Sequence, residues 1–143
     1  MHQLSDGHRA RIGTVTVTAA AVEHDVPAFA ARIETAGAVP AYAGDSAPCD
    51  SLVEPAENCD VLLCEADGPA PSAHHHTPEE AGGTASAAGA GASIVTHVGP
   101  FLTPREATAR AASRFGGRVA YAAPGEVFGL PGVRGSLPDS PVG

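Results

Sequence analysis

The sequence predicts an α/β protein in which helices pack on a β-sheet. The first observation is that β-branched strand material is concentrated near the start, from about residue 11 to residue 45. The second is that helical and strand segments alternate beyond it, an order typical of helices layered on a sheet. The third is a hydrophobic content of 43% against 17% charged residues over 143 residues, which fits the core of one globular domain.

The strand-rich start divides into several short elements. Ile12, Val15 and Val17 alternate with threonines, which gives the β-branched density of a strand. "AFAARIE" is a second apolar segment, and "TAGAVP" supplies turn residues before "AYAGD". This part of the chain therefore predicts successive antiparallel strands.

The segment after Asp45 predicts a helix and then a buried strand. "SAPCDSLVEPAENCD" can begin a helix with Asp45 or Ser46 as its N-cap, and Pro55 should shorten or kink that helix. The continuous apolar run "VLLCEA", residues 61–66, predicts a strand covered on both faces. A loop, "DGPAPSA", then leads to three consecutive histidines.

Two further helices have clear start signals. "TPEE" carries Thr77 as N-cap and Glu80 at the third helical position, and "TPRE" repeats this device with Thr103 and Glu106. Between them "SIVTH" predicts a short buried strand that ends at His97, and "RVAYAAPG" predicts a last strand. The Pro-, Gly- and Ser-rich residues 129–143 predict a disordered tail.

Composition argues against several functional classes. With 8 basic and 16 acidic residues the formal charge is −8, which disfavours a broad nucleic-acid surface. No apolar stretch reaches the length of a membrane span, and no secretory signal is visible, so we expect a cytoplasmic protein. Three cysteines form no disulfide framework, and no second Cys or His pair gives them zinc-finger spacing, so they are interpreted as reduced structural thiols.

Polar residues follow the predicted strands. Asp45 follows "AYAG", His97 follows "SIVT", and His75 precedes a helix; a carboxylate and imidazoles suit Zn²⁺ or Mn²⁺. Each also has a plainer interpretation: Asp45 as a helix cap, the "HHH" run as a solvated loop, and His97 as a core histidine. Glu65 can approach the same site, or it can be a carboxylate whose hydrogen bonds are supplied by a helix or a loop.

Four motifs in order, "YAGDS", "LLCEA", "HHTPEEAG" and "IVTHVGP", resemble the second half of metallo-β-lactamase-fold hydrolases, especially the ribonuclease Z-like branch. The similarity runs from about Val17 to about Val127 and includes "VEHDVPAFAARI" and "FGGRVAYAAPGEVF". The resemblance implies half of an αββα sandwich, one mixed β-sheet with helices on one face. The expected organisation is a polar segment at 1–10, this half-domain at 11–128 and the tail at 129–143.

The resemblance also implies roles for individual residues. Asp45 matches the carboxylate that bridges two metals, and His97 matches an imidazole that binds the second metal. His75, 22 positions before His97, matches a histidine that acts at the scissile phosphate as general acid or charge stabiliser. His74 and His76 flank it and leave the register open by one residue; His24 matches a position near the substrate with no assigned role.

The implied function is metal-dependent hydrolysis of a phosphodiester or related ester by a metal-bound hydroxide. The implied cofactor is Zn²⁺ in a two-metal site, with Mn²⁺ as the alternative, and the implied substrates are small esters or phosphodiesters, with RNA among those the family admits. The family's His-x-His-x-Asp-His cluster has no counterpart here, since His2 and His8 lie six apart without the aspartate. We therefore expect a truncated half with little or no activity.

Two consequences and two alternatives complete the sequence-based interpretation. In a truncated half, the sheet face that normally packs on the first half of the fold would be uncovered and apolar. Such a face predicts a homodimer or docking onto a separate N-terminal half. The first alternative is a non-catalytic α/β binding or scaffold domain in which the histidines are incidental. The second is a zinc-storage or metal-sensing loop centred on residues 74–76.

Overall fold

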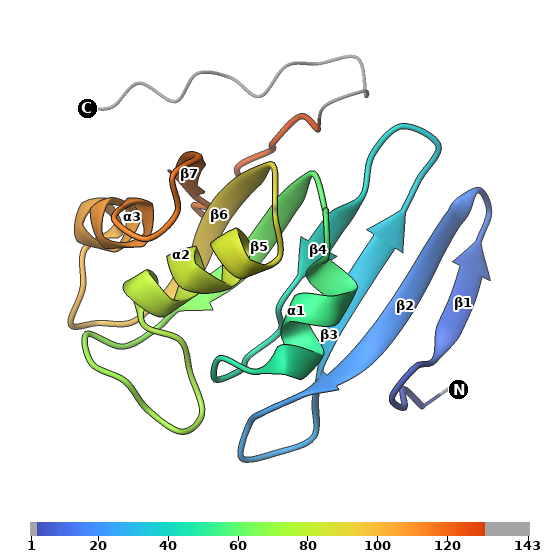
Figure 1. Cartoon of the computed structure of the whole chain (residues 1–143), viewed down its shortest axis with the longest axis horizontal. Coiled ribbons are helices and arrows are strands. Elements are labelled where there is room, and N and C mark those ends of the chain that lie inside the picture. Colours follow the sequence, from blue (N-terminus) through green and yellow to red (C-terminus); the bar gives the residue numbers. More distant parts are fainter. Residues whose placement is uncertain (1–2, 131–143) are drawn as a thin grey trace.

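The computed structural model describes residues 3–130, and within them a seven-stranded sheet carries three helices on one face (Figure 1). The predicted fold class, one mixed sheet with helices on one face, is confirmed. The strands are β1 (Arg9–Ile12), β2 (Val15–Val22), β3 (Ala28–Glu34), β4 (Pro40–Tyr42), β5 (Val61–Ala66), β6 (Ala92–Val98) and β7 (Arg118–Tyr121). The helices are α1 (Asp50–Ala56), α2 (Pro78–Ala87) and α3 (Pro104–Ala112).

The strands lie side by side in chain order, and the sheet changes character at β4. Strands β1 to β4 pair antiparallel, as predicted for the strand-rich start, whereas β4 to β7 pair parallel. Each parallel pair is joined through a helix, which is the connection that parallel neighbours require. Strand β1 begins at Arg9, inside the segment expected to be a polar lead, and residues 131–143 of the expected tail lie outside the described residues.

The helix starts confirm two predictions and correct a third. Thr77 accepts a hydrogen bond from the N–H of Glu80, whose side chain accepts from Thr77 in return, and Thr103 and Glu106 repeat this capping box. The prediction that Asp45 or Ser46 caps the first helix is wrong. Helix α1 begins at Asp50, after Cys49 as N-cap, and makes no side-chain cap bond.

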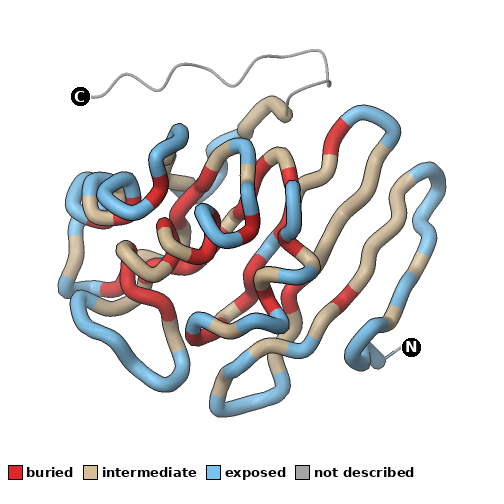
Figure 2. Tube along the Cα trace, viewed as in Figure 1, coloured by how far each residue is buried: buried red, intermediate tan, exposed pale blue. Residues whose placement is uncertain are grey.

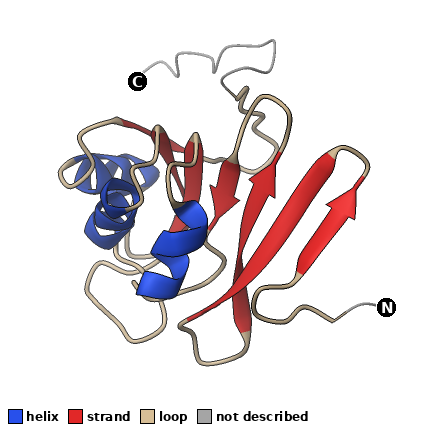
Figure 3. Cartoon of the chain, turned by 45° about the vertical axis from the view of Figure 1, so that its right-hand side comes forward, coloured by secondary structure: helices blue, strands red, loops and turns tan. Residues whose placement is uncertain are grey.

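The main core lies between the sheet and the helices (Figures 2 and 3). It is rich in alanine, and these small side chains let the elements approach closely. Leu52 of α1, Leu62 and Cys64 of β5, and Val95 of β6 are almost completely buried among alanines. Gly82 of α2 faces the backbone carbonyl of Ala111 in α3, where a Cβ atom would lie 2.1 Å from that oxygen. The two helices therefore pack nearly backbone to backbone.

The opposite side of the sheet carries no helix in the described part of the chain and presents apolar side chains. Successive residues of a strand point to opposite faces, so residues that alternate with the core-facing ones belong to this side. Val17 pairs with Ile33 and Ala31 with Tyr42 across neighbouring strands, and Tyr42 is 41% exposed. We call this surface the open face and define it by these members: Ile12, Val17, Phe29, Ile33, Tyr42 and Leu63.

Candidate active site

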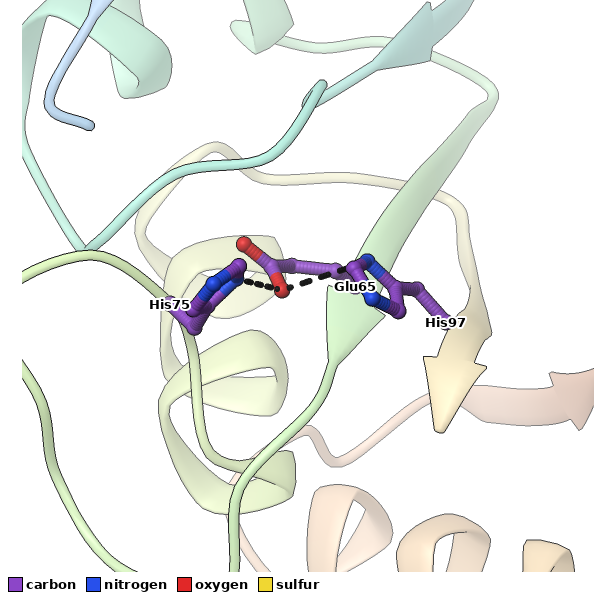
Figure 4. Close-up of side chains that lie close together, drawn as sticks. All are labelled: Glu65, His75 and His97. Carbon is purple, nitrogen blue, oxygen red and sulfur yellow. Dashed lines mark hydrogen bonds and ion pairs between the residues drawn. The ribbon is translucent and has the colours of Figure 1, made fainter. Parts of the chain in front are cut away.

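The candidate site lies where the parallel strands β4, β5 and β6 end. Asp45 follows β4. Glu65 stands near the end of β5, His97 near the end of β6, and His75 in the loop before α2 (Figure 4). Carboxyl ends of adjacent parallel strands meet at one edge of a sheet, which is where α/β proteins place ligands. The topology therefore brings together residues separated by as many as 52 positions.

Asp45 and His97 contact each other directly. Oδ1 of Asp45 lies 3.1 Å from Nδ1 of His97, and both side chains are 45% exposed. Gly44, directly before Asp45, has a left-handed φ of +67°, and a Cβ there would lie 2.5 Å from the carbonyl oxygen of Phe29. The backbone at this position therefore requires glycine.

His97 is presented by a β-bulge. Glu65 pairs with Thr96 and Ala66 pairs with Val98, so His97 is an extra residue on β6. Its φ of +45° is an uncommon conformation for a non-glycine residue, and backbone strain of this kind clusters at functional sites. The bulge redirects the imidazole from the regular strand alternation toward Asp45.

Glu65 is the buried centre of the cluster. Its side chain is 1% exposed; Oε1 accepts from the N–H of Ser46 at 2.6 Å and Oε2 lies 2.7 Å from Nδ1 of His75. Oε2 also lies 3.7 Å from Nδ1 of His97. Burial raises the pKa of Glu65, while the bonds from Ser46 and His75 oppose that rise. Both possibilities that the sequence left open for Glu65 therefore hold. The loop at Ser46 supplies a hydrogen bond to its carboxylate, and the same carboxylate lies in the candidate site.

The three consecutive histidines have three different environments. The ring of His75 contacts Glu65, and His74 is exposed, with its carbonyl oxygen 2.9 Å from Nδ1 of His24. His76 is fully buried, with Nδ1 on the carbonyl oxygen of Ser46 and Nε2 on the hydroxyl of Thr84. Of the three, only His75 has its ring against Glu65.

Two further residues border the cluster. The ring of His24 packs edge-on against His75 with centroids 5.0 Å apart, and His75 packs likewise against His97 at 5.6 Å. Oδ1 of Asp67 lies 3.6 Å from Nε2 of His97, a contact that the sequence analysis missed. Its only sequence signal is its position just after β5, at the same sheet edge as Asp45.

The arrangement of donor atoms fits a divalent cation. Two ligands of one zinc ion, each about 2.0–2.2 Å from it, lie about 3–3.5 Å apart in tetrahedral geometry. The 3.1 Å separation of Asp45 Oδ1 and His97 Nδ1 falls in that range. Asp67 beside the other nitrogen of His97 is the carboxylate that commonly orients a metal-binding histidine. A second, overlapping set is Glu65, His75 and His97, whose ligand atoms lie within 4.8 Å of one another.

The cysteines lie outside this cluster. All are free thiols, and Cys59 and Cys64 are buried in the core under the helices. Burial raises the pKa of Cys59 to about 11 and also raises that of Cys64. Thiols of such low acidity are poor metal ligands and nucleophiles, in agreement with their interpretation as structural residues. Across residues 3–130 no helix has the length and apolar character to cross a bilayer.

Comparison with known proteins gives consistent relatives. Residues 1–98 match the sequence profile of the family described as Beta-lactamase superfamily domain. An uncharacterised protein of Mycobacterium tuberculosis is 34% identical over 124 residues, 83% of this chain and 45% of the relative. Ribonuclease Z of the same organism is 31% identical over 130 residues, 73% of this chain and 45% of the enzyme.

A solved structure shows the same arrangement. The metallo-β-lactamase-fold protein YhfI of Bacillus subtilis superimposes with a TM-score of 0.81 at 30% identity, over 88% of this chain and 54% of YhfI. The chain thus spans about half the length of these relatives. It belongs to the beta-lactamase superfamily, with a metallo-β-lactamase fold and ribonuclease Z-like relatives.

Proposed function

We propose that this chain supplies part of the site of a metal-dependent hydrolase that cleaves a phosphodiester or related ester. The observation that carries the proposal is the contact between Asp45 and His97 at 3.1 Å, with His75 held beside them by buried Glu65. The substrate class is supported by the ribonuclease Z relative, and the metal by the carboxylate and imidazole donors. RNA and smaller phosphodiesters both belong to that class.

Each residue has a distinct role in this proposal. Asp45 and His97 hold Zn²⁺, or Mn²⁺ in its place, and Asp67 orients the ring of His97. The cation, when bound, supplies positive charge that acidifies a water molecule and stabilises the leaving oxygen. His75 donates a proton to the leaving group or stabilises its charge, and Glu65 fixes the orientation of that imidazole.

The chain by itself should have little activity. A catalytic zinc usually has three protein ligands, and Asp45 with His97 provides two. The open face is the surface through which the remaining ligands would be supplied, since a contiguous apolar sheet face is usually covered by another polypeptide layer. The layer is either a second copy of this chain or a separate N-terminal half.

Metal binding by the purified chain tests the proposal. Zn²⁺ uptake, measured by elemental analysis after dialysis and by calorimetry, should fall about tenfold or more in Asp45→Asn and in His97→Gln. Asp50→Asn, an exposed carboxylate of α1, and His8→Gln, away from the cluster, are matched controls that should bind as the unmodified chain does. Unchanged uptake in the Asp45 and His97 variants would overturn the ligand assignment and favour a non-catalytic binding domain.

The overlapping set of Glu65, His75 and His97 is a second candidate for the metal site. Its support is that its ligand atoms lie within 4.8 Å of one another. Glu65→Gln and His75→Gln should abolish binding if this set holds the cation, while Asp45→Asn should not. A zinc-storage loop at residues 74–76 is less well supported, because both ring nitrogens of buried His76 already have protein partners.

A further inference from the structure

We propose that His76 is a positioning residue that holds Asp45 at a fixed position relative to His75. The inference rests on the proposed function, in which Asp45 binds the metal and His75 acts on the substrate. The hydrogen bonds of the His76 ring go to Ser46 and Thr84, and none goes to Asp45 or to the side chains of the cluster. It acts through Ser46, the residue that follows Asp45.

The loop that presents Asp45 is held on both sides of that residue. Before it, Gly44 lies against the backbone of Phe29. After it, Ser46 is fully buried, and its N–H donates to Glu65 at 2.6 Å while its carbonyl oxygen accepts from His76 at 2.5 Å. Both backbone groups of Ser46 are therefore committed, and Asp45 has little freedom to move relative to them.

The contacts of His76 indicate which of its ring nitrogens carries the hydrogen. A carbonyl oxygen only accepts, so Nδ1 must carry the hydrogen that it donates to Ser46. Nε2 lies 3.0 Å from the hydroxyl of Thr84, and in the neutral ring, which burial favours by lowering the pKa of His76, it accepts from that hydroxyl. His76 thereby links the Asp45 loop to the body of α2, and each of its ring nitrogens has one defined partner.

These contacts close a ring that includes the catalytic candidate. His75 and His76 are joined by one peptide bond; His75 contacts Oε2 of Glu65, Glu65 accepts from Ser46, and Ser46 accepts from His76. A shift of the loop at Ser46 would consequently move Asp45 relative to His75. In this geometry His76 determines the distance between Asp45 and His75. That role differs from the general contribution of a buried side chain to the core.

Variants of the full chain test this role with two measurements. His76→Leu fills the cavity without either hydrogen bond, and His76→Asn retains a side-chain N–H near the position of Nδ1. Thr84→Val removes only the partner of Nε2. Phe115→Leu is the control, because Phe115 is buried just after the end of α3 and makes no hydrogen bond in this network. The measurements are hydrogen exchange of the Ser46 amide in metal-free protein and Zn²⁺ affinity by calorimetry.

His76→Leu should increase exchange of the Ser46 amide and weaken Zn²⁺ binding by about 10- to 100-fold, the cost of losing an outer partner of a metal site. His76→Asn should retain most of the Zn²⁺ affinity of the unmodified chain. The affinity of Thr84→Val should lie between those of the unmodified chain and His76→Leu. Phe115→Leu should change neither measurement beyond its effect on global stability. If His76→Leu does not fold, His76→Asn and Thr84→Val still decide: with Ser46 protection and Zn²⁺ affinity unchanged in Thr84→Val, the link to α2 has no positioning role.

Two outcomes would overturn the inference: unchanged Ser46 protection and Zn²⁺ affinity in His76→Leu, or an equal loss in Phe115→Leu. Failure of the proposed function has a separate signature, which is Zn²⁺ binding by the unmodified chain that does not depend on Asp45. In that case the exchange of the Ser46 amide still tests the role of His76, because it is measured without metal.

Discussion

The carboxylate of Glu65 joins two parts of the candidate site: Oε2 lies 2.7 Å from Nδ1 of His75, and Oε1 accepts from the N–H of Ser46 at 2.6 Å. One buried group therefore holds both the loop that presents Asp45 and the imidazole beside it. A carboxylate can accept on both oxygens, whereas an apolar residue in the same strand position would leave the Ser46 N–H unsatisfied. This arrangement explains a glutamate in an otherwise apolar strand.

Glu65→Gln should change the tautomer of His75. A carboxylate oxygen only accepts, so Nδ1 of His75 carries the hydrogen of this contact. A glutamine can still accept from Ser46, but it then presents its NH₂ group to His75, so that Nδ1 becomes an acceptor and the hydrogen moves to Nε2. Long-range ¹H–¹⁵N spectra distinguish these tautomers. Glu57→Gln, at an exposed position, is the control, and an unchanged His75 spectrum in Glu65→Gln would contradict the assigned contact.

Gly44→Ala should destabilise the protein and distort the site. The φ of +67° disfavours alanine, and the added Cβ would lie 2.5 Å from the carbonyl oxygen of Phe29. We expect the free energy of unfolding to fall by about 1–3 kcal/mol. Gly83→Ala is the matched control: Gly83 lies in α2 with open space around it, so alanine should stabilise by about 0.5–1 kcal/mol. Urea unfolding measures both, and equal effects would refute the backbone argument.

The ion pair of Glu79 and Arg110 should make stability depend on acid pH. Nε of Arg110 donates to Glu79 at 2.7 Å, and Arg110 also donates to the carbonyl oxygen of Pro69 in the loop that leads to His75. The hydrogen bond from Arg110 lowers the pKa of Glu79 below its ordinary 4.5. The ion pair therefore contributes stability above pH 4.5 that is lost as the pH falls through the folded-state pKa.

Glu79→Gln should accordingly reduce the free energy of unfolding at neutral pH by about 0.5 kcal/mol, a value suited to a partly exposed pair. The difference from the unmodified protein should shrink between neutral pH and about pH 3, because protonation of Glu79 removes the same charge as the pH falls toward its lowered folded-state pKa. Urea unfolding at the two pH values measures it, with Glu54→Gln at an exposed position of α1 as control. A deficit that persists unchanged in acid would show that packing, and not charge, makes the contribution.

The open face should cause the isolated chain to associate. Val17 and Ile33 are cross-strand neighbours on this surface, and Ile12 is 68% exposed. The double variant Val17→Lys, Ile33→Glu should reduce association in sedimentation velocity and lower binding of an apolar dye, because opposite charges replace an apolar pair without mutual repulsion. Phe101→Lys is the control: this residue is 82% exposed but lies in the loop after β6. A stable monomer that binds no dye would contradict the prediction.

Local chemistry determined much of this protein from its sequence. The capping boxes at Thr77 and Thr103 were predictable because a cap depends on residues within one helical turn. The order of strands and helices followed from apolar runs and turn residues, and the positions of Asp45 and His97 after strands marked them as candidates. These signals are contained in short segments and do not require knowledge of which strands are neighbours.

Tertiary structure decided which side chains meet. Asp45 contacts His97 across 52 positions because β4 and β6 flank β5 and because a bulge turns His97 out of the strand alternation. The same packing separates His75 from His76, which the sequence left interchangeable, since one ring faces Glu65 and the other is buried between Ser46 and Thr84. Lateral strand order, a single extra residue and the burial of Glu65 are properties of the assembled sheet, and no local pattern encodes them.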